Sequence, residues 1–204
     1  MDTRQYLDFY LIRHGITKAN QEKRYVGWTD VSLLQEEIGQ LTHLKTVLEN
    51  QPWLQVYTSD LKRCTETLSF LGIKGNKDSR LREANFGGWE MSTYDDLKEK
   101  IHYRNWLDCP FEVTPPGGES YMDFQKRVRE WLEERLASVS SGAVLAVTHG
   151  GVIRQLLLEL GAAASFWEAK VPHGKALIVR MVKYKEGWQC MSLSEVPSQE
   201  NEHI

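Results

Sequence analysis

The sequence predicts an α/β fold, a three-layer α/β/α sandwich with a mostly parallel central sheet. Apolar stretches of strand length alternate with longer stretches of helical periodicity, which is the pattern of strands joined by helical crossovers. Residues 143–149 form a near-continuous apolar run, as expected for a strand covered on both faces. No repeat or low-complexity tract interrupts the 204 residues. We therefore expect one domain over residues 1–193 and a polar C-terminal tail over residues 194–204.

The first half of the chain contains two predicted strands and two predicted helices. Residues 8–15, DFYLIRHG, are typical of a buried strand that enters a loop. Residues 33–50 carry apolar side chains at helical spacing. Residues 54–60 form a short strand of β-branched and aromatic character. The helix over residues 61–72 ends at Gly72, the residue type favoured just past a helix end.

The second half opens with a loop-rich segment and then resumes the alternation. Residues 82–116 hold one predicted helix, around residues 94–107. The turn PPGGES at residues 115–120 precedes an amphipathic helix of about five turns. The apolar strand at residues 143–149 is followed by a helix over residues 150–161. Residues 175–193 then predict two strands joined around Glu186-Gly187.

The composition is that of an ordinary globular protein and does not indicate which ligand it binds. The chain is 41% hydrophobic and 26% charged, with a net charge of −3, which gives no global attraction to nucleic acid or to an anionic membrane. Three widely spaced cysteines show neither a disulfide framework nor a zinc motif. There is no signal-peptide pattern and no apolar run of transmembrane length. We expect a cytoplasmic protein with no metal and no cofactor, and no nucleic-acid or membrane partner.

Three predicted strands end in, or lead directly to, polar residues of the types that bind anions or act in catalysis. The first ends in Arg13 and His14, the second leads to Ser59 and Arg63, and the third ends in His149. Ligands of such sheets collect beyond the carboxyl ends of the strands. Each residue alone has an ordinary structural explanation, as a helix cap or a surface ion-pair partner. The repetition at three strand ends is what indicates a site.

The starts of two helices add to this cluster. Arg63 lies in the first turn of its helix, where side chains lean toward the N-terminus, so it should reach back over the end of its strand. Gly150-Gly151 allow the backbone at a helix start to come close to an anion. Two arginines, two histidines and a helix N-terminus at one rim would form an anion cradle, for which phosphate is the natural ligand.

Five motifs, in chain order, resemble those of the histidine phosphatase superfamily, also called the phosphoglycerate-mutase-like family. They are LIRHGITKAN, YTSDLKRCTETL, LREANFGGWE, PPGGES and VLAVTHGG, and the resemblance runs from about residue 9 to about residue 182. The RHG and THG elements together are the most specific. The resemblance implies a phosphoglycerate-mutase-like fold and a metal-independent phosphatase that works through phosphohistidine.

The resemblance also implies roles for five catalytic residues. His14 would attack phosphorus, and Arg13, Arg63 and His149 would hold the phosphoryl oxygens. Glu83 would donate a proton to the leaving group and then act as base toward water. A nucleophilic histidine must be neutral, and neighbouring arginines favour this by lowering its pKa. Guanidinium groups can stabilise phosphoryl transfer without a metal.

Four further residues are expected to bind substrate. They are Asn20, which would reach the phosphate or its ester oxygen, the backbone N–H of Gly150, Ser59 and Glu119. The partner implied is a small-molecule phosphate ester, and a homodimer is left open. The resemblance is imperfect at Ile16, where the family usually has Glu or Gln, and around residues 27–39, where its pattern is followed only loosely.

Two other functions stay open at this stage. A mutase would need the same core, but mutases of the family carry a long insertion between the acid and the second histidine. Here Glu83 and His149 are 66 positions apart (83 to 149), which favours the compact phosphatase branch. A non-catalytic binder would be expected to lose His14 or Glu83. The substrate is left open between α-ribazole-5′-phosphate and a broad range of small phosphorylated metabolites.

Several conspicuous aromatic residues are given structural roles. Trp28, Trp89 and Trp106 could wall a pocket for a ring-bearing substrate, but packing is the commoner use of tryptophan. His173 stands where family members often carry Asn, and we expect it to be structural or on the surface rather than in the pocket. Cys64 is expected to be buried and inert.

Overall fold

A computed structural model describes residues 5–197 of the chain. Its centre is one six-stranded sheet with strand order β3-β2-β4-β1-β5-β6. The strands are β1 (Tyr6–Arg13), β2 (Trp53–Thr58), β3 (Asn76–Lys77), β4 (Gly142–Thr148), β5 (Ala176–Tyr184) and β6 (Gly187–Val196). The four strands β1 to β4 pair in parallel, whereas β5 and β6 join antiparallel. The predicted, mostly parallel sheet is confirmed.

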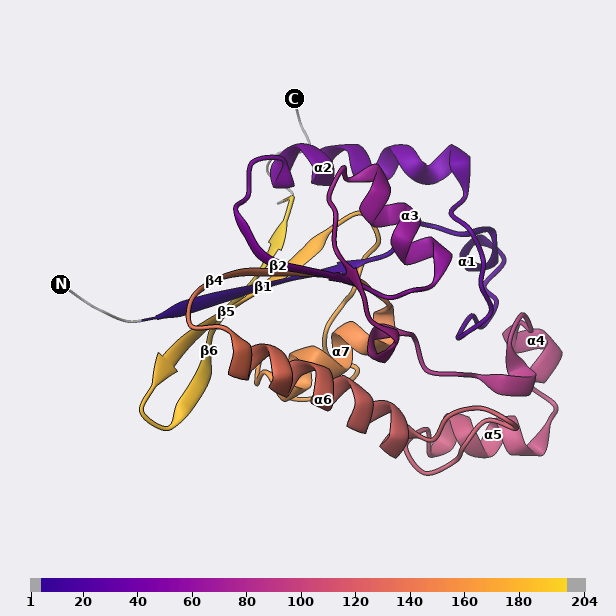
Figure 1. The fold of residues 1–204 in the computed structure, drawn as a ribbon. Coiled ribbons are helices and arrows are strands. Elements are labelled where there is room, and N and C mark those ends of the chain that lie inside the picture. The colour runs from indigo at the N-terminus through magenta and orange to yellow at the C-terminus, as the bar shows by residue number, and fades with distance from the viewer. Residues whose placement is uncertain (1–4, 198–204) are drawn as a thin grey trace.

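Helices cover both faces of the sheet, so the three-layer prediction is also confirmed (Figure 1). One face packs against α6 (Tyr121–Ser138) and α7 (Gly150–Glu159), and the other against α2 (Thr42–Leu48) and α3 (Lys62–Phe70). In β4, alternate side chains enter the two cores, because successive residues of a strand point to opposite faces. Val144 and Ala146 pack in the first core, and Leu145 and Val147 pack in the second.

Two predicted helices are each divided in the structure. Residues 33–50 form a 3₁₀ helix, η1 (Gln35–Leu41), followed by α2, and Gly39 lies inside the 3₁₀ part, where its low helix propensity weakens a regular helix. The predicted helix at residues 94–107 is α4 (Tyr94–Leu97) and α5 (Ile101–Asp108). The shorter elements are α1 (Lys18–Gln21), η2 (Ser79–Leu81) and η3 (Gly87–Trp89).

The C-terminal strands form a hairpin, as the sequence predicts. It turns at Gly187, whose φ of +127° favours glycine. Strand β6 continues to Val196, paired with Ala176, so the strand runs into the segment predicted as a tail from residue 194. Residues 198–204 of that segment lie outside the described residues. Within residues 5–197, no helix is long and apolar enough to cross a membrane.

The order of the strands brings three predicted site segments together. In the sheet, β4 lies between β1 and β2, with Arg13 opposite Thr148 and Thr58 opposite Val147. The parallel ladder continues past the strand ends: the N–H of His14 donates to Thr148 O at 3.0 Å, and that of Ser59 donates to Val147 O at 2.9 Å. The exits of β1, β2 and β4 therefore meet at one edge of the sheet.

Candidate active site

His14 is held with one ring nitrogen available for attack. Its Nδ1 lies 2.7 Å from Gly15 O, so the Nδ1 proton is donated to that carbonyl and the Nε2 lone pair is left free. The side chain is only 5% exposed. Burial, followed by the charge of Arg63, holds the pKa of His14 well below its ordinary value. The neutral, correctly oriented imidazole that a nucleophile needs is therefore present.

Two arginines flank this histidine without a carboxylate partner. Arg13 donates from Nη1 to Val171 O at 2.9 Å, and Arg63 donates to Gly27 O and Thr29 O at 2.7 and 3.0 Å. Neither guanidinium is within ion-pair distance of a carboxylate of residues 5–197. Arg63 leans back over the strand end, as its first-turn position predicts. Unneutralised, largely buried cations of this kind favour a bound anion.

His149 lies beside His14, with ring centroids 5.2 Å apart. Its Nε2 is 3.0 Å from Ser59 Oγ. A hydroxyl that donates to Nε2 leaves the Nδ1 proton for a phosphoryl oxygen. Burial, followed by the charge of Arg63, holds the pKa of His149 well below its ordinary value. Ser59 is fully buried and its hydroxyl contacts His149, and its expected contact with substrate stays a prediction.

The Glu83 carboxylate lies at the start of α7. Oε1 accepts from the N–H of Ala84 and Oε2 from the N–H of Gly151, both at 3.0 Å. A Cβ on Gly151 would overlap Oε1 and lie 3.2 Å from the carboxyl carbon. Because α7 begins directly after His149, Glu83 lies at the same strand exit as the second histidine.

The carboxylate of Glu119 forms an ion pair with an arginine of α6. Its carboxylate pairs with Arg127, with Nε–Oε1 and Nη2–Oε2 distances of 2.6 and 2.8 Å. Arg127 also donates to the carbonyls of Arg80, Arg82 and Glu83 at 2.6 to 2.9 Å. The pair thus holds the backbone that carries Glu83, and the expected contact of Glu119 with substrate stays a prediction.

Asn20 and Gly150 stay predictions as substrate ligands, with geometry compatible with that role. Asn20 Oδ1 accepts from the N–H and hydroxyl of Thr17 at 3.1 and 2.9 Å, in a capping box that leaves the amide donors uncommitted. A Cβ on Gly150 would lie 3.5 Å from Arg13 Cζ, so the backbone at the start of α7 approaches the guanidinium closely.

His173 packs directly against His14, in keeping with the structural role that the sequence analysis favoured. Its Nδ1 donates to the backbone carbonyl of His14 at 2.6 Å, and the two rings lie edge to face with centroids 5.4 Å apart. Burial and then the charge of Arg13 lower the pKa of His173 to about 4. A neutral His173 therefore fixes the backbone of the nucleophile.

An aromatic pocket of about 370 Å³ adjoins Glu83, Gly151 and Arg154. Its aromatic lining is Tyr25, Phe86, Trp106, Phe111, Tyr121, Phe124, Phe166 and Trp167. Of the three tryptophans considered above, Trp106 lines this pocket. Trp89 is 3% exposed in a separate core, and Trp28 donates to Glu83 O at 2.8 Å. Trp106 therefore lines the pocket, whereas Trp89 packs in a core and Trp28 hydrogen-bonds to the backbone.

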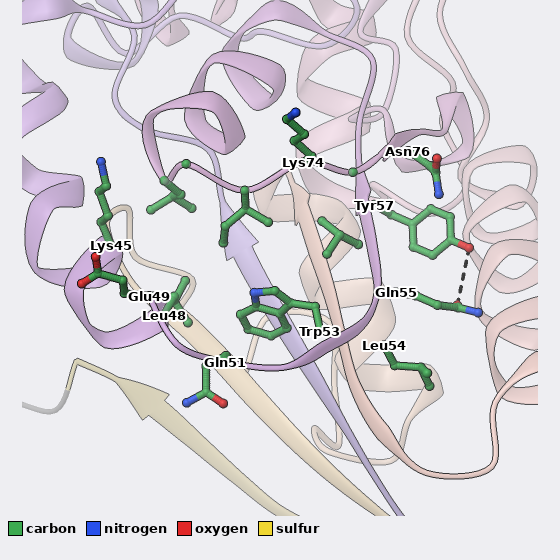
Figure 2. A pocket seen from close by; sticks show the side chains of 15 residues that line it. Lys45, Leu48, Glu49, Gln51, Trp53, Leu54, Gln55, Tyr57, Lys74 and Asn76 are labelled. Atoms are coloured by element: carbon green, nitrogen blue, oxygen red, sulfur yellow. Dashed lines mark hydrogen bonds between the residues drawn. The ribbon is translucent and has the colours of Figure 1, made fainter.

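A larger, open groove of about 950 Å³ runs along β2 (Figure 2). Lys45, Trp53, Lys74 and Asn76 are among its lining residues, with a hydrogen bond of 3.4 Å from Tyr57 to Gln55. The lining contains no histidine, arginine, serine or cysteine. This groove therefore lacks the residue types that are gathered at the exits of β1, β2 and β4.

Comparison with known proteins agrees with this geometry. The family model of the histidine phosphatase superfamily (branch 1) matches residues 9–196. An adenosylcobalamin/α-ribazole phosphatase of Salmonella typhimurium is 31% identical over 174 residues, 81% of this chain and 86% of the relative. A 2,3-bisphosphoglycerate-dependent phosphoglycerate mutase 2 of Gloeobacter violaceus is 29% identical, over 74% of each chain.

The fold agrees as well. The crystal structure of a putative α-ribazole-5′-P phosphatase from Escherichia coli superposes with a TM-score of 0.82 at 25% identity, over 92% of this chain and 96% of that one. The residues matched by the family model, 9–196, include Arg13, His14, Arg63, Glu83 and His149. With its sequence, fold and strand-exit residues in agreement, the chain belongs to branch 1 of the histidine phosphatase superfamily.

Proposed function

We propose that this chain hydrolyses a phosphomonoester through a phosphohistidine formed at His14. The observation that carries the proposal is the free Nε2 of a neutral, buried His14, flanked by Arg13 and Arg63, which have no carboxylate partner among the described residues. An anion bound there would be neutralised by the guanidinium groups and would lie in reach of the nucleophile.

In the first step, the Nε2 lone pair of His14 attacks phosphorus and the bond from phosphorus to the ester oxygen breaks. The protonated Glu83 carboxyl gives its proton to that oxygen, and the alcohol leaves. Arg13, Arg63 and His149 stabilise the charge on the three equatorial oxygens. In the second step water attacks phosphorus, the Glu83 carboxylate takes a proton from it, and phosphate leaves with His14 restored.

The aromatic pocket supports a leaving group that carries a flat apolar ring. Offset and edge-to-face ring contacts are the interactions that such a lining offers. α-Ribazole-5′-phosphate joins a phosphorylated ribose to a benzimidazole ring, and the names of the relatives make it the first substrate to test. Phosphoglycerate is small and fully charged, so it leaves the aromatic lining unused, which favours hydrolysis over the mutase reaction.

The cytoplasm is the location we propose for this activity. Cys64, Cys109 and Cys190 are all unpaired, which is typical of proteins in a reducing compartment. Burial raises the pKa of the Cys64 thiol, and this disfavours a reactive thiolate next to His149.

The mechanism is tested by brief mixing with a phosphorus-labelled ester and an alkaline quench. An acid-labile phosphoprotein is expected for the native chain and none for His14→Ala. Turnover by His14→Ala without a trapped intermediate would contradict the mechanism. Phosphate release from α-ribazole-5′-phosphate, 3-phosphoglycerate and sugar bisphosphates, measured with EDTA present, ranks the substrates. Isomerisation of phosphoglycerate in excess of phosphate release would identify a mutase, and a chain that bound phosphate without turnover would be a binder.

A further inference from the structure

Arg154 is a cation without a hydrogen-bond or ion-pair partner in the described part of the chain. It lies in the second turn of α7, and no carboxylate or carbonyl of residues 5–197 accepts a hydrogen bond from it. Its Nε is buried without an acceptor. The nearest recorded interaction of the guanidinium is with the ring of Trp167, whose centroid is 5.8 Å from Cζ. An arginine left in this state at a pocket wall indicates a ligand that accepts hydrogen bonds.

The head of Arg154 lies at the boundary between two parts of the site. Its Nη1 and Arg13 Cζ are both 3.5 Å from the point that a Cβ on Gly150 would occupy, so the two guanidinium groups are neighbours at the start of α7. After burial, the positive charge of Arg154 further lowers the pKa of Arg13, although Glu83 opposes this. Arg154 also lines the aromatic pocket together with Trp167. It therefore stands between the phosphoryl site and the ring site.

We propose that Arg154 is a specificity residue that binds the hydroxyl-bearing linker between the phosphate and the ring of the substrate. The substrate class is then a phosphorylated sugar that carries an apolar ring. This inference rests on the proposed function and deepens it. Sugar hydroxyl and ring oxygens are acceptors for the donors of a guanidinium. Arg13, Arg63 and His149 already surround the reacting phosphate, whereas Arg154 extends toward Trp167 and the aromatic pocket.

The proposal is tested with three esters that share the phosphate. Phenyl phosphate has a ring and no linker, ribose-5-phosphate has a linker and no ring, and α-ribazole-5′-phosphate has both. Arg154→Met should lower kcat/KM for the two linker-containing esters by about 10- to 100-fold, the range for a lost hydrogen bond to a charged group, mainly through KM. Phenyl phosphate should be hydrolysed nearly as fast as by the native chain.

Arg104→Met is the matched control. Arg104 also makes no ion pair to a described carboxylate, and it is exposed on α5 and lines neither pocket, so its loss should change kcat/KM for none of the esters. Because Arg154→Met breaks no ion pair to a described residue, its melting temperature should stay close to that of the native chain. Arg154→Lys, which keeps the charge, should recover part of the linker-specific loss.

Three results would overturn the inference. An equal loss on all three esters would assign Arg154 to the phosphoryl group, and no loss on any ester would remove it from the site. A loss confined to 3-phosphoglycerate, assayed alongside, would assign it to a second anion. Failure of the proposed function is a separate result, since the native chain would then release no phosphate from any ester and form no phosphohistidine.

Discussion

The substitution Gly151→Ala should displace Glu83, the proposed general acid, without disturbing phosphate binding. The new Cβ would overlap Glu83 Oε1 and lie 3.2 Å from the carboxyl carbon, so the carboxylate must move by about 1 Å, a misplacement that costs on the order of 10²-fold in rate. That value is at the lower end of the usual contribution of general acid catalysis. Alanine also has a helix propensity up to about 1 kcal/mol better than glycine, so Gly151→Ala should not unfold the chain.

The assay compares two leaving groups. Ribose-5-phosphate loses an alkoxide that must be protonated as it leaves, whereas p-nitrophenyl phosphate loses a stable phenolate. The value of kcat/KM depends only on the steps up to and including the first irreversible phosphoryl transfer. The rate at which the phosphohistidine is hydrolysed therefore does not affect it. Gly151→Ala should lose about 10²-fold on ribose-5-phosphate and little on p-nitrophenyl phosphate, and Glu83→Gln should show the same selectivity.

Gly39→Ala is the control, because a Cβ there meets nothing within 4 Å and should change neither rate. If Gly151→Ala slowed both esters equally, the substitution would have disturbed the phosphoryl ligands rather than the acid. If it slowed neither ester, the assignment of Glu83 as the proton donor would be refuted.

Acid should destabilise the fold, since His14, His149 and His173 are buried with pKa values below the ordinary one. Below about pH 6.5 the unfolded chain binds protons that the folded chain excludes, so the free energy of unfolding should fall between pH 7 and pH 5, by about 2 kcal/mol for His173, whose pKa is about 4. Equal urea midpoints at the two pH values would contradict this. Arg127→Met should cost about 3–5 kcal/mol in urea unfolding, because Glu119 is left nearly buried without its cation, and adding Glu119→Gln should recover much of that loss. A loss without such recovery would point to packing instead. EDTA should leave kcat/KM unchanged, since guanidinium groups supply the positive charge at the phosphate, and a loss that Mg²⁺ or Zn²⁺ restored would refute this.

The sheet could be predicted closely, and the helices less so. The alternating burial of Val144, Leu145, Ala146 and Val147 follows directly from an apolar run too long to face water on either side. The periodicity of residues 33–50 marks which side chains face the core, but a 3₁₀ turn and an α-helix present nearly the same face over a few residues. The change at Leu41 therefore depends on packing that the sequence does not display.

The site could be predicted where side chains follow strands. Arg13, His14 and His149 are fixed by the register of β1 and β4, which the pattern of apolar runs indicates. The structural role expected of His173 fits its contact with the backbone carbonyl of His14, but that partner, 159 residues away, could not be predicted because every residue supplies a backbone carbonyl. Arg154 had a usable signal, since it lies four residues after Gly150 and side chains at that spacing share one helix face.

The aromatic pocket also bears on how such a chain could acquire new substrates. Most of its lining comes from one continuous segment, residues 84–120, which connects η2 to α6. The nucleophile, the second histidine and the two arginines of the phosphoryl site belong to the sheet and its first helical turns instead. Part of the proposed recognition surface is thus encoded in one continuous stretch, whereas Arg154 and Trp167 lie outside it. Exchanging residues 84–120 between relatives would alter the lining of the pocket and would keep Arg13, His14, Arg63 and His149, provided that position 119 keeps the carboxylate that pairs with Arg127.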